Sequence, residues 1–580
     1  MPSISLPDNP SLENLKKQAK RFLDAVRAGD AEAIASVREF HPKGEQAVAG
    51  FSLSDAQLVS ARRYGFASWP KLKKHLETLD EYTWSPPPET DSPADRFIRL
   101  ACVDYDSWNL SYAEKARRFL AEHPEVAREN IYTAAAAGDI AAVRDMLARE
   151  PALASARGGP NRWDPLLYAC YSRINSSDPN HSTLEVARLL LDAGADPNAG
   201  FLWRGLLCPF TALTGAFGGG EAGVNNPPHR DCNELARLLL DAGADPNDEQ
   251  TLYNRGFERN DDHLKILFSY GLGRDQGGPW FKRLDGRLRS PEKMVSEEVW
   301  SAARRNRFDR LKLLVENGAD VNTPGFRDGR TPYEAALRAG NGEIAEYLAE
   351  HGAKRVSLND AEVFAAALTN GRRAEAMALI EKDPKRIEKL GHHGRIELLH
   401  RAVEMNHPEG ILLMAELGFE ISDTTKHDGV GANLAATPLH AAAWTGHLGM
   451  VKLLIGLGAN PDVRDPNYHA TPLGWAAYNG KQHVVDYLLD FASIFDAVRC
   501  GGFARVRALL EKDPSLATAL DSDGDPVIFY VQANEEMLSL LIAHGADINA
   551  RHHSGQTLLE QAVGRGDDAL AEALGRHGAG

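Results

Sequence analysis

Cysteine is scarce in this sequence, and its spacing excludes two kinds of small scaffold. The chain has 580 residues but only five cysteines, with no CxxC pair: Cys102, Cys170, Cys208, Cys232 and Cys500. A zinc ribbon needs paired CxxC spacings, and an odd cysteine count does not suit a disulfide framework. The pattern instead favours a protein of the reducing cytoplasm.

Long apolar runs and a basic leader are also missing. No stretch approaches the ~18 consecutive apolar residues of a membrane-spanning helix. The first residues, MPSISLPDNPSLENLKKQAK, have no apolar core after a basic start, which excludes a secretory signal of the usual form. We therefore expect a soluble, cytoplasmic protein that does not bind membranes.

Basic residues are fewer than acidic ones: 65 Lys and Arg against 81 Asp and Glu. The formal net charge is −16, so the surface repels phosphate backbones and nucleic acid is not expected as a partner. Residues 11–77 carry twelve Lys and Arg against eight Asp and Glu, a local excess that is typical of a solvated helical face. The sequence also lacks a GxGxxG after a strand, a P-loop, a GxSxG and an HExxH. We therefore predict no catalytic residues, metal or cofactor; an enzyme is disfavoured but stays open.

Repetition is what the sequence has in abundance. The twelve residues ARLLLDAGADPN occur twice, at 187–198 and 236–247. Around the second copy three leucines share one helical face: Leu235, Leu238 and Leu239. Gly243 suits a left-handed helix stop, and Ala-Asp-Pro-Asn then makes a turn. The unit is therefore the end of a helix running into a turn.

A second signature precedes several copies of this unit. Variants of the first unit occur at 312–322, 452–462 and 539–549. The second signature reads TPYEAALRAGNGE, TPLHAAAWTGHLG and TPLGWAAYNGKQH, at 331–343, 437–449 and 471–483. Threonine caps a helix there while proline occupies its first turn, and small alanines let a second helix pack closely. Less regular units end in an acidic residue and proline instead of Gly-Ala-Asp.

Together these signatures resemble the ankyrin repeat, whose period is about 33 residues. The resemblance covers roughly residues 95–580 and rests on the TPLH and GADxN motifs. It implies an all-α ankyrin-repeat solenoid of about thirteen helix-turn-helix units, in which each unit covers an apolar face of the next. We expect a monomer, with the last unit serving as a cap. His440 of TPLH is expected to tie neighbouring turns by hydrogen bonds.

Residues 1–80 differ from the array. The segments SLENLKKQAKRFLDAVRAGD, SLSDAQLVSARRYGF and SWPKLKKHLETL predict three amphipathic helices. They resemble a helical module that precedes ankyrin arrays in some bacterial proteins. Residues 81–93 are interpreted as a linker, because SPPPETDSP suits an exposed joint. The array then divides into irregular repeats with long insertions, 94–300, and more regular repeats, 301–580.

The spacing of the stop glycines locates the insertions. Gly194 and Gly243 are 49 residues apart, an excess of 16 over the period, and Gly271 and Gly318 are 47 apart, an excess of 14. The extra residues fall in four turns: 173–181, 218–233, 274–294 and 423–437. Long loops on a rigid solenoid are common recognition elements, so the region 155–297 is the predicted site.

Two functions compete for that region. The favoured one is a scaffold that binds an unidentified protein partner through its concave face, turns and inserted loops. The alternative is an enzyme or small-molecule receptor with a pocket built by the insertions of 155–297. The candidate binding residues are Trp163, Asp164, Tyr168, His181, Trp203, Arg204, Asn225, His229, Asp231 and Trp280.

Several histidines have spacings that can suit a metal ligand or an exposed turn. His229 and Asp231 have the H-x-D spacing of an iron-binding triad, with His181 as a conceivable third ligand, but a proline-rich loop is the wrong scaffold for it. We expect packing and capping there instead. The pairs His392–His393 and His552–His553 fall in inter-repeat turns and are expected to be exposed.

Overall fold

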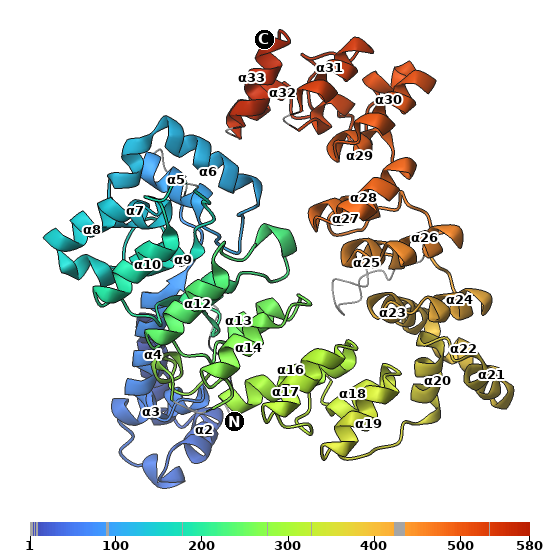
Figure 1. Ribbon diagram of the computed structural model, residues 1–580. Helices are drawn as coiled ribbons and strands as arrows, with labels where there is room; N and C mark the ends of the chain where they lie inside the picture. Colours follow the sequence, from blue (N-terminus) through green and yellow to red (C-terminus); the bar gives the residue numbers. More distant parts are fainter. Residues whose placement is uncertain are drawn as a thin grey trace. The chain divides into compact units, whose positions relative to one another are not determined.

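The structure is a computed structural model, shown in Figure 1, in which the helices follow one another along the chain. It describes residues 4, 6, 10–88, 92–176, 178–274, 277–325, 328–422, 436–532, 534–565 and 567–580. Residue contacts divide the chain into two compact units. Unit 1 comprises Met1–Glu298 with Glu316–Ala319, and unit 2 comprises Val299–Val315 with Asp320–Gly580.

The N-terminal module of unit 1 contains four helices. These are α1 (Leu12–Arg27), α2 (Ala31–Phe40), α3 (Leu53–Arg63) and α4 (Trp69–Tyr82), with a short 3-10 helix η1 (Gly44–Ala47) after α2. The three predicted helices correspond to α1, α3 and α4; α2 was not predicted. Side chains of Ser11, Asp30 and Ser52 cap three of the helices. Two apolar clusters, around Val37 and around Leu72, give the module its own core.

Five helix pairs follow in unit 1. They are α5 (Pro93–Ala101) and α6 (Ser111–Glu122), α7 (Ile131–Ala137) and α8 (Ile140–Arg149), α9 (Pro165–Tyr171) and α10 (Thr183–Asp192), α11 (Ala212–Phe217) and α12 (Cys232–Asp241), and α13 (Glu249–Arg255) and α14 (Asp262–Ser269). Short 3-10 helices lie between them: η2 (Pro124–Arg128), η3 (Pro151–Ser155) and η4 (Gly223–Asn225). The insertion after α14 contains α15 (Pro279–Arg283).

A small sheet interrupts the helices of unit 1. Strands β2 (Gly200–Trp203) and β3 (Pro209–Thr211) form an antiparallel hairpin between α10 and α11. Strand β1 (Thr83–Trp84) pairs with β2 in parallel, with Thr83 opposite Leu202 and Trp84 opposite Trp203. The segment interpreted as an exposed linker therefore begins with a strand whose Trp84 is only 3% exposed.

Unit 2 continues the same architecture. Its pairs are α16 (Pro291–Arg304), which begins in unit 1, and α17 (Phe308–Glu316), α18 (Pro332–Arg338) and α19 (Gly342–Glu350), α20 (Asp360–Thr369) and α21 (Arg373–Lys382), α23 (Gly391–Glu404) and α24 (Pro408–Glu416), α25 (Pro438–Thr445) and α26 (Leu448–Gly456), α27 (Pro472–Tyr478) and α28 (Gln482–Leu488), α29 (Ile494–Arg499) and α30 (Phe503–Lys512), and α32 (Leu558–Gly564) and α33 (Asp568–Arg576). In the unit before the last, a 3-10 helix η8 (Val527–Tyr530) takes the place of the first helix before α31 (Glu535–Ala543). Short connecting helices are α22 (Arg386–Lys389), η6 (Leu489–Phe491) and η7 (Pro514–Thr518).

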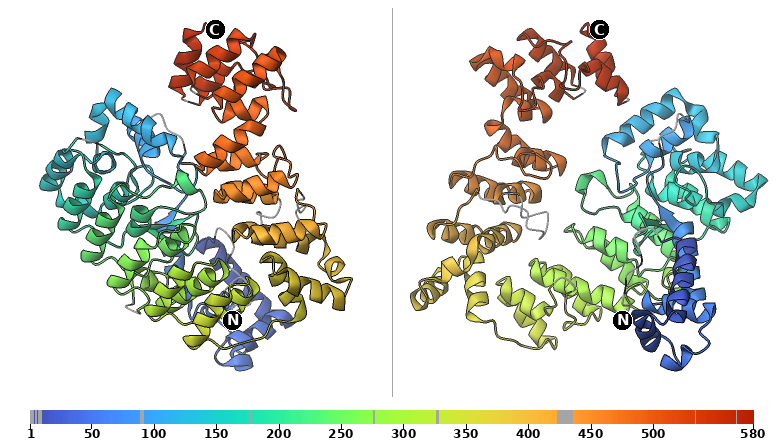
Figure 2. Two further views of the ribbon diagram at one scale, coloured as in Figure 1. Left: turned by 45° about the vertical axis from the view of Figure 1, so that its right-hand side comes forward. Right: turned by 180° about the vertical axis from the view of Figure 1, so that it is seen from behind.

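The helix pairs account for the predicted repeat number. Within the described residues there are thirteen pairs of α-helices and one pair that begins with η8, which agrees with the prediction of about thirteen units. Figure 2 shows successive pairs lying side by side within each unit. In unit 2 one apolar cluster runs from Phe364 to Leu574, so each pair there covers the apolar face of its neighbour.

Helix ends behave as their residues predict. The glycines that end the second helix of nine repeats all have positive φ, between 80° at Gly418 and 99° at Gly243, which is the left-handed region that favours glycine. They are Gly194, Gly243, Gly271, Gly318, Gly352, Gly418, Gly458, Gly545 and Gly578. Thr331 and Thr437 each form a capping box with the third helical residue, and proline follows both. The helix starts and stops of the repeats are therefore encoded locally.

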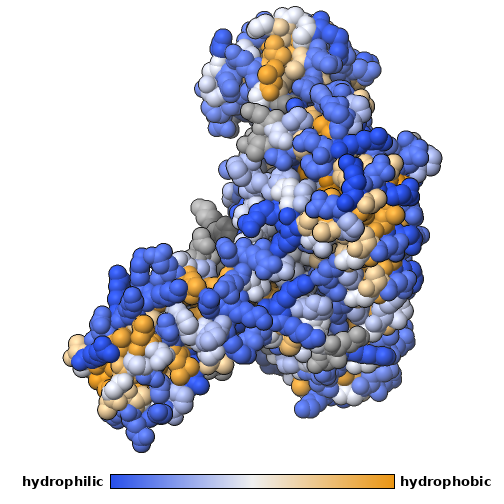
Figure 3. Space-filling model, turned by 90° about the vertical axis from the view of Figure 1, so that its left-hand side faces the viewer, coloured by the Kyte–Doolittle hydropathy of each residue, from blue (hydrophilic) through white to orange (hydrophobic). Residues whose placement is uncertain are grey.

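Figure 3 shows one face of the molecule, on which hydrophilic residues predominate and apolar residues gather in separate patches. Among the described residues, no helix is both long and apolar enough to cross a membrane. All five cysteines are free thiols.

Candidate partner-binding surface

Two predicted site residues that precede the first insertion, Trp163 and Tyr168, are buried and not presented at the surface. Trp163 is 0% exposed, and its indole stacks on Phe201 with ring centroids 4.6 Å apart and an interplanar angle of 16°. Trp84 lies 6.0 Å from it. Tyr168 is also buried, and its hydroxyl donates to the Gly158 carbonyl at 2.8 Å. These aromatic side chains form the core around the small sheet.

Trp280 helps to hold the N-terminal module. Its indole N–H donates to the Asn198 carbonyl at 2.9 Å, and its ring meets Tyr82, the last residue of α4, edge-on at 5.1 Å. Leu202, Trp280 and Leu284 form one apolar cluster with residues of α4. The insertion 274–294, as far as the structure describes it, is therefore a docking platform for the module.

Two further contacts fix the module on this platform. Lys71 donates to Asp285 at 2.9 Å, and the Arg287 guanidinium lies 3.7 Å from the centre of the Phe66 ring. Both partners from the array belong to the inserted residues, which explains why the repeat period is broken at this point.

The second insertion, 218–233, is anchored by a buried arginine. Arg173 is 4% exposed, and its guanidinium donates to the carbonyls of Cys170, Ser172, Gly215 and Pro227 at 2.7–3.1 Å. Burial lowers the pKa of Arg173. Four backbone carbonyls thus surround the cation, and one of them, that of Pro227, belongs to the insertion.

The two histidines of the first two insertions have separate hydrogen-bond partners. His229 lies 2.7 Å from the Thr183 hydroxyl through Nε2, and its Nδ1 accepts the backbone N–H of Asp231 at 3.0 Å. Burial and the nearby charge of Arg173 lower the pKa of His229 to about 3, so it is neutral at physiological pH. His181 instead contacts Asp178 at 3.2 Å. Asp231 occupies the cap position of α12, but its side chain makes no capping hydrogen bond.

The remaining candidates also have partners within the chain. Asp164 lies 3.7 Å from Arg157, and the Asn225 side chain accepts the Leu110 N–H at 3.3 Å. Arg204 pairs with Asp106 and lies over the half-buried Trp203, 5.1 Å from the ring centre. Arg204 is exposed, whereas Trp203 is half-buried, as are Asn225 and Asp231.

A shallow cleft lies beside Trp280 in unit 1. It is lined by Asp248, Arg289 and neighbouring side chains and encloses about 40 Å³. That is room for a few waters at most. Asp248 is already held by the hydroxyls of Thr211 and Thr214 and by the Thr251 N–H. Of the predicted site residues, Trp280 alone lines it.

An exposed aromatic cluster lies instead on two regular repeats of unit 2. We call it the aromatic patch: Trp444 at the end of α25, Trp475 and Tyr478 on α27, and Tyr468 in the turn before α27. Tyr468 is 73% and Tyr478 54% exposed, while the two tryptophans are half-buried. The fourth insertion, 423–437, precedes α25, but residues 423–435 lie outside the described residues.

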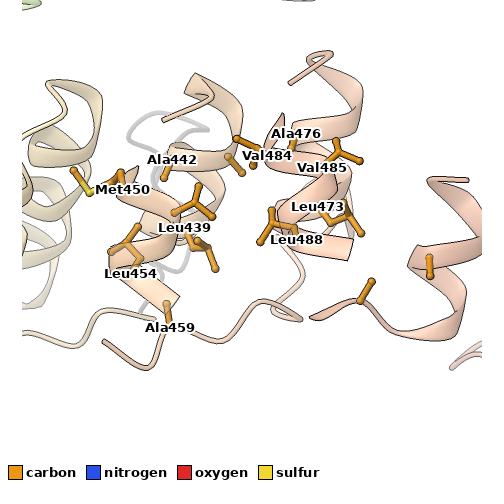
Figure 4. Close-up of a cluster of buried hydrophobic side chains, with 14 of the residues drawn as sticks. Leu439, Ala442, Met450, Leu454, Ala459, Leu473, Ala476, Val484, Val485 and Leu488 are labelled. Atoms are coloured by element: carbon orange, nitrogen blue, oxygen red, sulfur yellow. The ribbon is translucent and has the colours of Figure 1, made fainter. Parts of the chain in front are cut away.

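The patch rests on a well-packed core. Leu439 and Ala442 of α25 and Leu473 and Ala476 of α27 are buried in the shared apolar cluster, as Figure 4 shows. The buried face fixes the two helices, so their opposite faces hold the aromatic rings in a set arrangement.

Ring contacts and one carboxylate order the patch. Trp444 stacks on Tyr478 with centroids 6.1 Å apart, and Trp475 meets Trp444 edge-on at 5.8 Å. The Trp475 indole donates to Asp465 at 3.0 Å. Burial alone would raise the pKa of Asp465, but hydrogen bonds from that indole and from three backbone amides outweigh it and hold the pKa below its usual value.

His440, next to the patch, ties two neighbouring turns by hydrogen bonds, as predicted. Its Nδ1 lies 2.8 Å from the Thr437 hydroxyl and its Nε2 3.0 Å from the Ala470 carbonyl of the next repeat. Its ring meets Trp475 edge-on at 5.3 Å. Burial lowers the pKa of His440 to about 4.

The patch was not predicted, although the sequence holds a signal for it. Trp444 lies seven residues after Thr437 (444 − 437), and Tyr478 lies seven after Thr471 (478 − 471). Consecutive repeats therefore place a large aromatic ring at the same surface position, which packing within a repeat does not require.

Comparison with known proteins defines the class. Models of ankyrin repeats match residues 161–200, 299–349 and 399–497. The chain therefore contains ankyrin repeats, and its fold is an all-α ankyrin solenoid.

Several relatives share part of the array. B-cell lymphoma 3 protein homolog of Mus musculus is 32% identical over 199 residues, covering 31% of this chain and 44% of the relative. Rabankyrin-5 of Homo sapiens is 26% identical over 217 residues, covering 36% and 18%. Transient receptor potential cation channel subfamily A member 1 of Homo sapiens is 26% identical over 290 residues, covering 45% and 25%. The chain spans less than half of each relative, and all three are eukaryotic, so they bear on the repeats and not on the expected bacterial origin.

Proposed function

We propose that this chain is a scaffold that binds a protein partner through the aromatic patch. The observation that carries the proposal is the grouping of two tryptophans and two tyrosines on adjacent repeats, with Tyr468 and Tyr478 more than half exposed. Large aromatic side chains are costly to leave in water and dominate the energetic centres of interfaces. The ankyrin repeats shared with B-cell lymphoma 3 protein homolog and Rabankyrin-5 support a role in protein interaction.

The chemistry of the patch indicates what the partner presents. Its rings offer flat apolar faces, and its tyrosine hydroxyls and Trp444 offer polar edges, so an apolar side chain flanked by hydrogen-bonding backbone would fit it. The net charge of −16 disfavours a nucleic acid as partner. A cytoplasmic monomer remains part of the proposal, supported by the free cysteines.

Only two of the predicted site residues are proposed to contact the partner. Trp203 and Arg204 keep exposed surface and serve as a secondary contact. The other predicted residues are occupied by partners within unit 1, and their part in the proposal is to hold the insertions and the N-terminal module in place.

A pull-down with the full chain tests the proposal. Immobilised wild-type protein and the double variant Trp444→Ala/Tyr478→Ala are exposed to lysate of the source organism, and recovered proteins are quantified by mass spectrometry. We expect at least one prey to fall about tenfold or more with the double variant, because each interface aromatic is worth about 2 kcal/mol or more.

A matched control uses the other exposed aromatic pair. Tyr253 and Phe257 in unit 1 lie 5.3 Å apart and are 41% and 38% exposed. Tyr253→Ala should leave the same prey unchanged. Equal recovery with all three proteins, or equal loss with both variants, would remove the aromatic patch from the proposal.

A further inference from the structure

Two histidines and one aspartate meet at the turns near the end of unit 2. Asp525 precedes η8, and His552 and His553 lie in the turn between α31 and α32. His552 Nε2 lies 3.0 Å and His553 Nδ1 2.8 Å from the same carboxylate oxygen, Asp525 Oδ2. The three atoms lie within 4.8 Å of one another. The expectation that both histidines are exposed is wrong for His552, whose side chain is 23% exposed.

The surroundings hold each of these groups in place. The other carboxylate oxygen, Asp525 Oδ1, accepts the backbone N–H of His553 at 2.7 Å. His552 Nδ1 lies 2.9 Å from the Ser554 hydroxyl, and the Phe529 ring lies 5.4 Å from the His552 ring. Asp525 itself is 6% exposed, so its side chain has already lost its rotational freedom before a ligand binds. The donor set is thus preorganised by the fold.

We propose that Asp525, His552 and His553 bind a divalent cation of the zinc class. Two imidazole nitrogens and one carboxylate oxygen are a donor set that Zn²⁺ takes in tetrahedral sites, with water as the fourth ligand. Bonds of about 2.0 Å at tetrahedral angles place neighbouring ligand atoms about 3.3 Å apart. The separations of 3.0 Å and 2.8 Å to Asp525 Oδ2 need only a small widening to reach that geometry.

Cation binding requires one local change in the hydrogen bonds. Binding through His552 Nε2 requires the proton on Nδ1, which in the structure accepts the Ser554 backbone N–H at 3.2 Å, so that contact must give way to donation to the Ser554 hydroxyl at 2.9 Å. Binding through His553 Nδ1 requires the proton on Nε2. The His553 side chain is 57% exposed, so water can accept that proton and can also reach the fourth coordination position.

The cation would join two successive repeats. Asp525 belongs to the repeat of η8 and α31, and the histidines belong to the turn that leads into α32 and α33. A ligand that binds only the folded chain raises the free energy of unfolding with the logarithm of its concentration over its dissociation constant. Zinc would therefore stabilise the packing of the last two repeats against each other, independently of any partner on the aromatic patch.

Zinc binding to the full chain tests this inference. The protein is stripped with chelator and titrated with zinc chloride by calorimetry, and Co²⁺ replaces zinc to read the geometry from its visible absorption. We expect one tight zinc per chain and a tetrahedral cobalt spectrum. Asp525→Asn and His552→Gln/His553→Gln should each weaken the tight site at least tenfold.

Two further variants distinguish a loss of zinc binding from a loss of folding. His553→Gln changes a side chain that is more than half exposed, so the chain stays folded while zinc affinity still falls and the cobalt spectrum is lost. His392→Gln/His393→Gln alters the chain's other adjacent histidine pair, which is exposed at the start of α23, and should leave the tight site intact. Absence of tight zinc in the wild type, or a site that survives in all the Asp525, His552 and His553 variants, would overturn the inference.

Discussion

The ring of Trp444 lies stacked on the ring of Tyr478, with centroids 6.1 Å apart and planes inclined by 21°, across the boundary between two repeats. The two residues occupy equivalent positions in the sequence of those repeats. The contact therefore couples neighbouring repeats at the surface as well as in the core.

The stack should contribute modestly to stability. Replacing Trp444, Tyr478 or both with alanine should reveal a coupling free energy of about 0.5–1.5 kcal/mol, the range for an aromatic pair. A double-mutant cycle of urea unfolding on the full chain measures it. Strict additivity of the two single substitutions would show that the rings do not interact in solution.

Acidification should weaken the repeat that carries His440. Burial lowers the pKa of His440 from 6.5 to about 4, so between these pH values the unfolded chain binds a proton that the folded chain does not. The free energy of unfolding therefore falls as pH falls through this window, by about 2 kcal/mol between pH 7 and pH 5 from this group. Urea unfolding at the two pH values should show a smaller decrease for His440→Gln than for the wild type, although the variant starts from lower stability.

Loss of Arg173 should release the insertion 218–233. Arg173→Ala leaves four buried carbonyls without their donor, at about 1–3 kcal/mol for each unsatisfied group, so we expect a loss of at least ~3 kcal/mol. Hydrogen exchange should rise first at His229, whose neighbour Pro227 is held by the guanidinium. Arg173→Lys should not restore stability, because an ammonium cannot span four acceptors as a planar guanidinium does. Unchanged exchange at His229 in Arg173→Ala would contradict this anchoring role.

Two substitutions separate the forces that hold the N-terminal module. Trp280→Ala removes a buried ring from the platform and should cost about 3–5 kcal/mol, which releases the module. Lys71→Ala breaks a pair whose side chains are 51% and 42% exposed and should cost less than about 1 kcal/mol. Limited proteolysis distinguishes them: the module should be cut away rapidly from the first variant and at the wild-type rate from the second.

The repeats could be predicted from the sequence because their signals are local. Leucine spacing, a capping threonine before proline and a stop glycine each act within a few residues, and the structure confirms them at Thr331, Thr437 and Gly243. Strand β1 could not be predicted in the same way. It is two residues long, and Trp84 finds its partner Trp203 at a distance of 119 residues in sequence (203 − 84).

The contacts of the predicted site residues could not be predicted for a related reason. The count of extra residues located the insertions correctly, but it could not reveal that Trp280 would meet Tyr82 of the module or that Pro227 would meet Arg173. A long loop is expected to be free to bind a partner unless its contacts with residues distant in the sequence are known. The aromatic patch lies outside the region 155–297, where the excess length is largest, so repeat spacing did not point to it.

The contact between Lys71 and Asp285 has a consequence for synthesis on the ribosome. The module has its own apolar clusters and can fold as soon as it emerges, yet its platform is completed only near Leu288. The ribosome must add 206 further residues after Tyr82 (288 − 82). At about 5–20 residues per second this takes roughly 10–40 s. During that interval Leu79 and Tyr82 lack the residues that cover them in the folded chain, so this face of the module is open to binding by chaperones.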